Sequence, residues 1–545
     1  MESFLNMQNN KRIKNKFYIE NLICLFIILN PILDIISFLV RNKFYDNPGT
    51  TNSITALLRP IIPVILSIFI FIKSSGEQKR RLLLLVFIYV LYAVEHMLLC
   101  MDNFREWSYG TPKHEFSFVL NYTFFIVTLI VIKNIIGKDS KLKINRPKAN
   151  ITYGKVYNSI IIALAIYIIS IFISIFTKTS SYTYPEVNIG YKGWIESGNC
   201  LSIFLILAFG ILLSQINIPK NKKEILPQIG YVLLALVTSI YMIFLMGTRV
   251  GLYGTFIVLF VWTLLKLIID KRITLFISGL LVIILLGLGV YKFGSATLNR
   301  RTQLDQANQN IIEAHAIEID EKEPKKEEKK EPKKVAEDNI YKKESKNEEG
   351  KNHVTKDIGE VHEKIQSGNI SNNYMTIPQK ESIEKLYEEA KQKQVDSNDN
   401  RSQQLIYHVN LVKQERNIYK IFFGNGFQTP PGELILEKEF FALLFNFGIC
   451  GFILYFGPII AILLWAIIKV IVFIIKNRKT NLFKVIRNIS TKTFMQMFLI
   501  ALVVALSIVI GYILFNVSNS TLIATIIILL YNRIKEEIWK RYYLV

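Results

Sequence analysis

A lone arginine separates two long apolar stretches in FLMGTRVGLYG, residues 244–254. The Arg249 guanidinium is always charged, and its planar fork of N–H donors fits the oxygens of a phosphate group. Each flanking stretch is long enough to cross a bilayer, so the charge lies near membrane depth, where it costs up to about 3 kcal/mol. The sequence therefore predicts an anionic partner for Arg249. In the alternative, Gly247 and Gly251 pack closely against another helix, and Arg249 only reaches the membrane interface.

Three glutamates follow a turn rich in glycine and proline that runs from Gly424 to Gly432. Glu433, Glu437 and Glu439 lead from this turn into the next apolar stretch. A deprotonated carboxylate beside an acceptor hydroxyl can serve as a general base, and Glu437 is the first candidate, with Glu439 the second. On one helix these two side chains point in different directions. The alternative is an ordinary helix start, where acids favour the positive end of the helix dipole.

Aromatic and polar residues gather in a third segment. Tyr191, Trp194 and Glu196 lie in or beside GWIESGN, residues 193–199. The cluster is a candidate sugar-binding surface, or else an aromatic anchor at the membrane interface. Arg401, which precedes the acidic segment, is a candidate second clamp for phosphate.

The sequence offers no metal-ligand spacing. Its four cysteines, Cys24, Cys100, Cys200 and Cys450, lie within or at the ends of apolar stretches, which predicts small buried side chains. No metal site, no His/Cys cluster and no phosphate-cradling loop of the nucleotide type is expected. Asp34 is an acid inside an apolar stretch, and it either relays protons or joins helices.

Composition shows what must position these residues. Of 545 residues 51% are hydrophobic, yet 65 lysines and arginines against 43 acids give a net charge of +22. The apolar content must therefore be segregated into blocks, which predicts an all-α polytopic membrane protein with about twelve spanning helices. The expected spans lie near 20–40, 54–72, 82–101, 116–136, 157–177, 198–216, 228–246, 250–269, 273–293, 446–475, 494–515 and 518–531.

Basic residues concentrate in alternate connections between these spans. Because cytoplasmic loops carry the excess of lysine and arginine, both termini are expected in the cytoplasm and residues 294–436 outside it. The positive charge is explained by this topology and by attraction to anionic lipid, so the bilayer is the expected partner and nucleic acid is not.

The long loop divides the chain into three parts. Residues 1–293 form an N-terminal membrane bundle, 294–436 the extracytoplasmic loop, and 437–545 the C-terminal membrane helices. About 313–400 is highly charged and poor in aromatic residues, which predicts a disordered insertion. Its mixed charges would also suit a solvated helix or a tether to the cell wall.

The membrane part resembles the O-antigen ligase and polymerase family of bacterial polysaccharide assembly. The resemblance rests on GTRVG after an apolar span, on GWIESGN before another, and on a large loop that ends in FFGNGF and LEKEFFALLFNFGICGF. It implies a helical membrane fold similar to that of lipid-carrier-dependent (GT-C type) glycosyltransferases. It also implies transfer of a glycan from undecaprenyl diphosphate to a glycan or wall-polymer hydroxyl at the outer leaflet, without cofactor or essential metal.

Such a transfer assigns roles to the candidate residues. A cation must stabilise the negative charge that develops on the departing diphosphate, a role for Arg249 with Arg401 as a second clamp. The ligase branch usually carries a histidine after the glycine turn, and none lies between Gly424 and Gly451. His408 is the nearest, and we expect it to be a surface imidazole.

Glu437 and Glu439 lie where Gram-positive-like members carry a pair of acids. Their presence favours a polymerase, or a ligase that does not act on lipopolysaccharide. A flippase for lipid-linked oligosaccharide would also have many spans, although such transporters are commonly built from repeated halves and no internal repeat is visible here. A non-catalytic scaffold for wall assembly is the third possibility.

Overall fold

The computed structural model describes residues 19–44, 54–101, 112–137, 149–299, 356–368, 370, 375–395, 399–427, 434–477 and 482–539. Within them, eleven stretches are long and apolar enough to cross a membrane, which confirms the polytopic helical architecture. α3 is a further apolar helix, packed against α2 and α5. The long apolar helices are α2 (Glu20–Phe44), α3 (Ile54–Lys73), α4 (Gly76–Cys100), α5 (Pro112–Ile136), α6 (Ala149–Phe176), α7 (Gly198–Gln215), α8 (Lys222–Ile240), α9 (Arg249–Ile268), α10 (Ile273–Phe293), α18 (Gly457–Lys476), α20 (Thr491–Val509) and α21 (Val517–Ile534).

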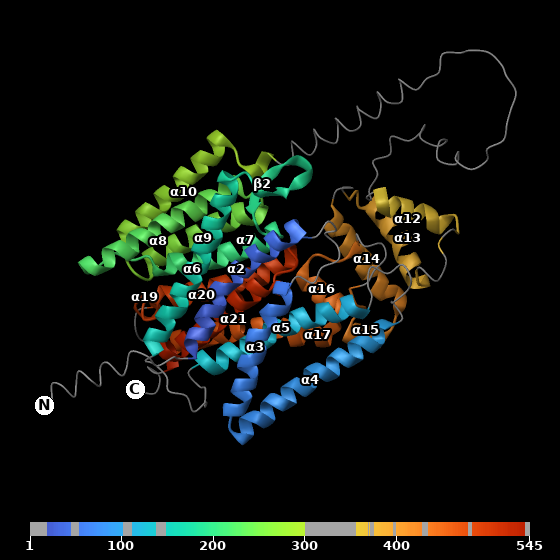
Figure 1. The fold of residues 1–545 in the computed structure, drawn as a ribbon, viewed down its shortest axis with the longest axis horizontal. Coiled ribbons are helices and arrows are strands. Elements are labelled where there is room, and N and C mark those ends of the chain that lie inside the picture. The colour runs from blue at the N-terminus through green and yellow to red at the C-terminus, as the bar shows by residue number, and fades with distance from the viewer. Residues whose placement is uncertain are drawn as a thin grey trace, which may run out of the picture.

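Two helices form the centre of the bundle. α7 and α21 are each 83% buried over their apolar windows, and both contact α20 as well as each other. Helices that are apolar on every side can be buried in this way. α4 and α10 lie at the edges of the bundle (Figure 1). Only 11% of each apolar window is buried, and leucine and isoleucine side chains on both helices are exposed. In a bilayer these outer faces meet lipid chains.

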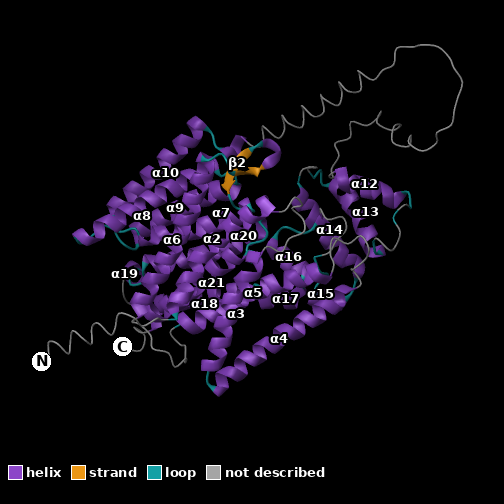
Figure 2. Cartoon of the chain, viewed as in Figure 1, coloured by secondary structure: helices purple, strands orange, loops and turns teal. Residues whose placement is uncertain are grey.

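A small β-hairpin joins α6 to α7. Strands β1 (Ser181–Tyr184) and β2 (Ile189–Gly193) pair antiparallel, and they are the strands that Figure 2 shows in orange. Gly190 has a positive φ of 69°, and a Cβ there would lie 2.4 Å from the carbonyl oxygen of Met246. The hairpin therefore packs directly on the turn that precedes α9. We call this end of the bundle, which also holds α12 to α15, the loop end.

The span expected at 446–475 is shorter in the structure, where only 457–476 forms a helix long and apolar enough to cross a membrane. The structure divides this region into α16 (Glu439–Asn446), α17 (Gly448–Tyr455) and α18. Gly448 has a positive φ of 69°, and a Cβ there would lie 2.5 Å from the Gly424 nitrogen. The break lets the Gly424 turn approach the chain closely. Apolar composition is the same in a spanning helix and in two short buried ones, so hydropathy does not reveal the break.

Helices also form within the long loop. They are α12 (Lys356–Gln366), α13 (Ile377–Gln392), α14 (Asn400–Glu415) and α15 (Ile418–Phe423). The disordered insertion expected over about 313–400 is therefore wrong from residue 356 onward, where helices form. Residues 300–355 lie outside the described residues. α12, α13 and α14, which we call the helical cap, share a core separate from that of the bundle. It contains Ile358, Val361, Met375, Ile383, Leu386, Ala390, Tyr407, Leu411 and Leu434.

The physical reason is an apolar stripe within the charged segment. Ile383, Leu386 and Ala390 recur at helical spacing in α13, and all are fully buried. Thr376 and Gln379 form a capping box that begins this helix. A segment that is charged on average can therefore still fold when its few apolar residues share one face.

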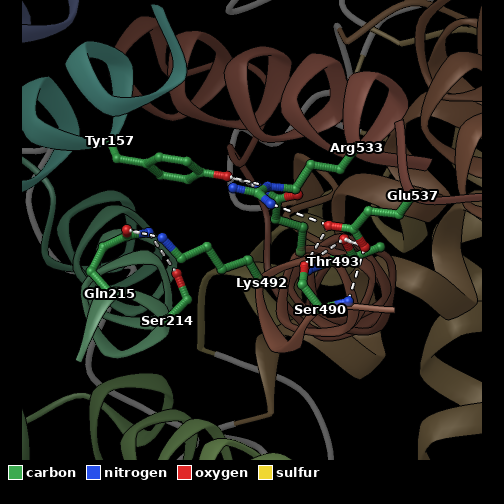
Figure 3. Close-up of polar contacts among 9 residues, drawn as sticks. Tyr157, Ser214, Gln215, Ser490, Lys492, Thr493, Arg533 and Glu537 are labelled. Carbon is green, nitrogen blue, oxygen red and sulfur yellow. Dashed lines mark hydrogen bonds and ion pairs between the residues drawn. The ribbon is translucent and has the colours of Figure 1, made fainter. Parts of the chain in front are cut away.

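A polar network ties the helices together at the opposite end of the bundle (Figure 3). The Arg533 Nε donates to the Tyr157 hydroxyl at 2.8 Å, which links α21 to α6. Lys492 at the start of α20 donates to Gln215 at the end of α7. Glu537 accepts hydrogen bonds from the Ser490 and Thr493 side chains and from the Ser490 N–H.

Candidate active site

Hydrogen bonds fix the turn before α9, and this turn positions Arg249. Thr248 is the N-cap of α9, and its hydroxyl accepts from the Gly251 N–H at 3.0 Å and bonds the Ser202 hydroxyl at 2.7 Å. Gly247 has a positive φ of 78°, which favours glycine. Arg249 itself is exposed, and no described residue hydrogen bonds or pairs with its side chain. The guanidinium is therefore presented at the positive end of a helix dipole with its donors available.

The hairpin places the aromatic candidates beside this turn. The Thr183 hydroxyl donates to the Met246 carbonyl at 2.7 Å, which fixes β1 to the turn. Tyr182 and Tyr191 face each other across the hairpin with ring centroids 5.4 Å apart. Trp194 donates from its indole nitrogen to the Thr179 hydroxyl at 3.0 Å.

Glu196 is exposed, and its carbonyl oxygen accepts from the Lys192 Nζ at 2.7 Å. Burial lowers the pKa of Lys192 below its ordinary value. The surface beside Arg249 therefore combines aromatic rings with an acid and a lysine.

Glu437 lies where the helical cap meets the bundle. Its Oε2 accepts from the Arg401 Nε at 3.0 Å, with the two side chains 42% and 36% exposed. Its backbone N–H donates to the Gln404 side chain at 3.1 Å. A Cβ on Gly511 would lie 1.6 Å from the Glu437 carbonyl oxygen, so the loop between α20 and α21 presses against this segment. The carboxylate is thus oriented by Arg401 and still reachable from solvent.

Glu439 has a different environment. It is 1% exposed, and its carboxylate accepts from the backbone N–H groups of Ile513, Leu514 and Phe515 at 2.9, 2.8 and 3.3 Å. Burial raises the pKa of Glu439 to about 7, and the N–H donors only partly oppose that shift. The side chain closes the loop between α20 and α21 and does not face solvent.

The N-terminus of α7 lies between two groups of candidate residues, Arg249 with the hairpin on one side and Glu437 with Arg401 on the other. Ser202 contacts Thr248 on the Arg249 side, while the Cys200 thiol donates to the Tyr512 carbonyl at 3.6 Å on the Glu437 side. The Arg249 side chain has no direct contact with Glu437 or Arg401 among the described residues. The two groups therefore flank one helix end at the loop end of the bundle.

Tyr512 is a residue of this region that the sequence did not single out. It has a left-handed φ of 63° and lies in the loop between α20 and α21. Burial and the charges of Glu437 and Glu439 raise the pKa of Tyr512 to about 12. Its only sequence signal is a short GY pair after an apolar run, which is too common to identify a site.

His408 corrects another expectation. The imidazole is 1% exposed and not on the surface, and its Nε2 donates to the Leu434 carbonyl at 3.0 Å. Burial lowers the pKa of His408 to about 4. The reason is its place beside Tyr407 and Leu411 on the buried face of α14.

Asp34 and the four cysteines have surroundings that fit a role in the fold. Asp34 pairs with Arg59 at 2.6 Å and accepts from the Ser518 and Tyr167 hydroxyls, so it joins α2, α3, α6 and α21. All four cysteines are free thiols. Cys100 and Cys200 are buried as expected, and Cys24 and Cys450 are partly buried.

An apolar groove lies beside the Arg249 turn. It runs between the last turns of α8 and the second half of α10, and Phe244, five residues before Arg249, belongs to its wall. Its lining residues are Leu236, Ile240, Phe244, Val282, Leu285, Leu286, Gly289 and Phe293.

Comparison with known proteins gives one family match over nearly the whole chain. Residues 14–537 match the family model described as O-antigen ligase like membrane protein. No curated protein and no solved structure matches the chain.

Proposed function

Because the chain belongs to the family of O-antigen ligase-like membrane proteins, we propose that it transfers a glycan from a lipid diphosphate carrier to a sugar hydroxyl in cell-surface polysaccharide biosynthesis. The observation that carries the proposal is the pair of groups on either side of the α7 N-terminus. One side presents a guanidinium that has no partner among the described residues, and the other an accessible carboxylate held by a second arginine.

Arg249 would bind the diphosphate. The C–O bond between the sugar and the carrier breaks with the electron pair on the leaving diphosphate, so charge develops there. A guanidinium stabilises such a charge, and the positive end of the α9 helix dipole would add to this effect. No nucleotide sugar or metal is needed for this step.

Glu437 would take the proton from the attacking hydroxyl. Its Oε2 is engaged by Arg401, while Oε1 has no partner among the described residues and can accept the proton. Arg401 would act as an orienting residue for Glu437, and since its side chain is 36% exposed, it would also be available to a second phosphate oxygen. Glu439, which is buried and bound to three N–H groups, is the weaker candidate for the base.

Two surfaces fit the rest of such a donor. The apolar groove between α8 and α10 would accommodate an isoprenoid chain such as undecaprenol, since it is lined by apolar side chains and leads to the Arg249 turn. The rings of Tyr182, Tyr191 and Trp194, with Glu196 beside them, would contact sugar units.

The proposal requires the loop end to face the outside of the cell, with both termini in the cytoplasm. Lys492 and Arg533 lie at the opposite end of the bundle, where an excess of basic residues is expected to face the cytoplasm.

Deletion of the gene, followed by analysis of lipid-linked and surface polysaccharide, tests the activity. Short units that fail to polymerise would support a polymerase, and full chains left on the carrier would support a ligase. Accumulation of lipid-linked units on the cytoplasmic leaflet would instead identify a flippase and overturn the proposal. Unchanged polysaccharide and carrier would also overturn it.

A further inference from the structure

Three potential metal ligands meet where α4 and α5 contact the Gly424 turn. His96 and Cys100 lie one helical turn apart at the end of α4, and Glu115 lies in the first turn of α5. Their side chains are 0%, 1% and 0% exposed. The His96 Nε2 is 2.9 Å from the Glu115 Oε1 and 3.7 Å from the Cys100 Sγ. One ligand atom from each residue lies within 4.8 Å of the other two.

The backbone fixes the orientation of two of these ligands. The Phe423 carbonyl lies 2.7 Å from the His96 Nδ1, and since a carbonyl can only accept, Nδ1 carries the proton. The Phe427 N–H donates to the Glu115 Oε2 at 2.9 Å. In neutral His96 the Nε2 lone pair therefore points at Oε1, which is also an acceptor. In metal sites, hydrogen bonds to the ligand atoms that do not face the metal hold histidine and carboxylate side chains in position.

Two acceptors that face each other in a buried site need a proton or a metal ion between them. A proton between them would satisfy His96 and Glu115, but it would not account for the Cys100 sulfur 3.7 Å from the same Nε2. A metal ion would use all three atoms. We propose that His96, Cys100 and Glu115 bind a divalent metal ion, with Zn²⁺ the best match to one nitrogen, one sulfur and one oxygen ligand.

The geometry is close to what Zn²⁺ needs. Zinc bonds of roughly 2.0 to 2.3 Å in a tetrahedral site place ligand atoms about 3.3 to 3.7 Å apart. The 3.7 Å separation of Nε2 and Sγ already fits, the 2.9 Å separation of Nε2 and Oε1 must widen slightly, and all three ligand atoms lie within 4.8 Å of one another. Gly426 closes the site on the third side. Its φ is 78°, and a Cβ would lie 2.9 Å from the Cys100 Sγ and 3.2 Å from the Glu115 Oε2.

The ion would join α4 and α5 beneath the turn that contains Phe423 and Phe427. Because those residues flank Gly424 to Gly426, the metal would fasten the FFGNGF segment to the bundle. Cys100 would ligate as a thiolate, so binding releases its proton. The inference does not depend on glycan transfer, since the site is buried and separate from Arg249 and Glu437.

The test is metal analysis of the full-length protein purified in detergent from cells supplied with Zn²⁺, then dialysed against a weak chelator. We expect about one Zn²⁺ per chain in the wild type. Cys100→Ser should lose most of it, and the matched control Cys450→Ser, at a partly buried cysteine of α17, should retain it. Cobalt substitution of the wild type should give the charge-transfer absorption of a Co²⁺-thiolate bond.

The cobalt spectrum keeps the test independent of how variants fold. A wild-type protein that is monodisperse, contains no Zn²⁺ and gives no thiolate band with Co²⁺ would overturn the proposal and leave a hydrogen-bonded His96–Glu115 pair. Equal metal content in Cys100→Ser and wild type, with the band also unchanged, would exclude Cys100 as a ligand and overturn the site as described.

Discussion

Arg249 has no partner in the described part of the chain, which makes its role testable by small chemical changes. Arg249→Ala should abolish transfer, and Arg249→Lys should lower it by about 100-fold or more, because an ammonium keeps the charge but loses the bidentate fork. The fold should be unaffected, since the side chain is exposed. Transfer is measured with purified protein and a lipid-diphosphate donor.

The control is Lys292→Ala, another exposed cation at the loop end. It should retain full activity. An arginine that only reaches the membrane interface would tolerate lysine. Near-normal transfer by Arg249→Lys would therefore remove Arg249 from the mechanism.

Glu437 and Glu439 provide an internal comparison of two acids close in sequence. Glu437→Gln can still accept from Arg401, so the fold should persist while turnover falls by about 100-fold or more. Glu439→Gln replaces a buried carboxylate that accepts three N–H bonds, and it should lower the free energy of unfolding by about 1 to 3 kcal/mol. Thermal unfolding and turnover per folded molecule separate the two effects.

The opposite pattern would reverse the assignment. If Glu437→Gln transfers glycan as fast as wild type while Glu439→Gln folds normally and is inactive, the base is Glu439. Its pKa near 7 would then be relevant to catalysis.

At the scale of elements, the helical cap should be sensitive to acid. The pKa of His408 is about 4 in the folded cap against roughly 6.5 in an unfolded chain. Between these values the unfolded state binds more protons, so stability is full above pH 6.5 and falls as the pH drops toward 4. The loss should approach about 3 kcal/mol near pH 4. Hydrogen exchange of α12 to α14, corrected for the intrinsic effect of pH, measures it.

His408→Gln is the matched variant, because an amide can still donate to the Leu434 carbonyl but does not titrate in this range. Its cap should exchange at a rate that depends less on pH than the wild-type cap. Identical pH dependence in the two proteins would mean that another group controls the stability of the cap.

Whether a feature can be predicted from the sequence depends on how far apart along the chain the interacting residues lie. The apolar blocks predict the long helices because the bilayer imposes a length on each one. The burial of Glu439 could not be predicted, because the loop that buries it, Ile513 to Phe515, lies far along the chain. In the same way, a site formed by His96, Cys100 and Glu115 depends on how α4 meets α5, which no local spacing reveals.

At the scale of the whole molecule, orientation is the assumption on which the site depends. We predict that Glu388→Cys, exposed on α13, reacts with an impermeant thiol reagent in intact cells. Lys223→Cys, exposed at the opposite end of the bundle, should react only after lysis. Labelling is compared with the wild type to correct for the native cysteines. The reverse result would place the loop end in the cytoplasm and remove the basis of the proposed reaction.

The position of the α7 N-terminus between the two groups has a kinetic consequence. Arg249 lies beside the apolar groove between α8 and α10, whereas Glu437 lies beside the cap and is 42% exposed. If the proposed roles hold, the carrier-linked substrate arrives laterally through the membrane and the acceptor arrives from the water. Neither has to leave before the other enters, so the enzyme would bind its two substrates in random order.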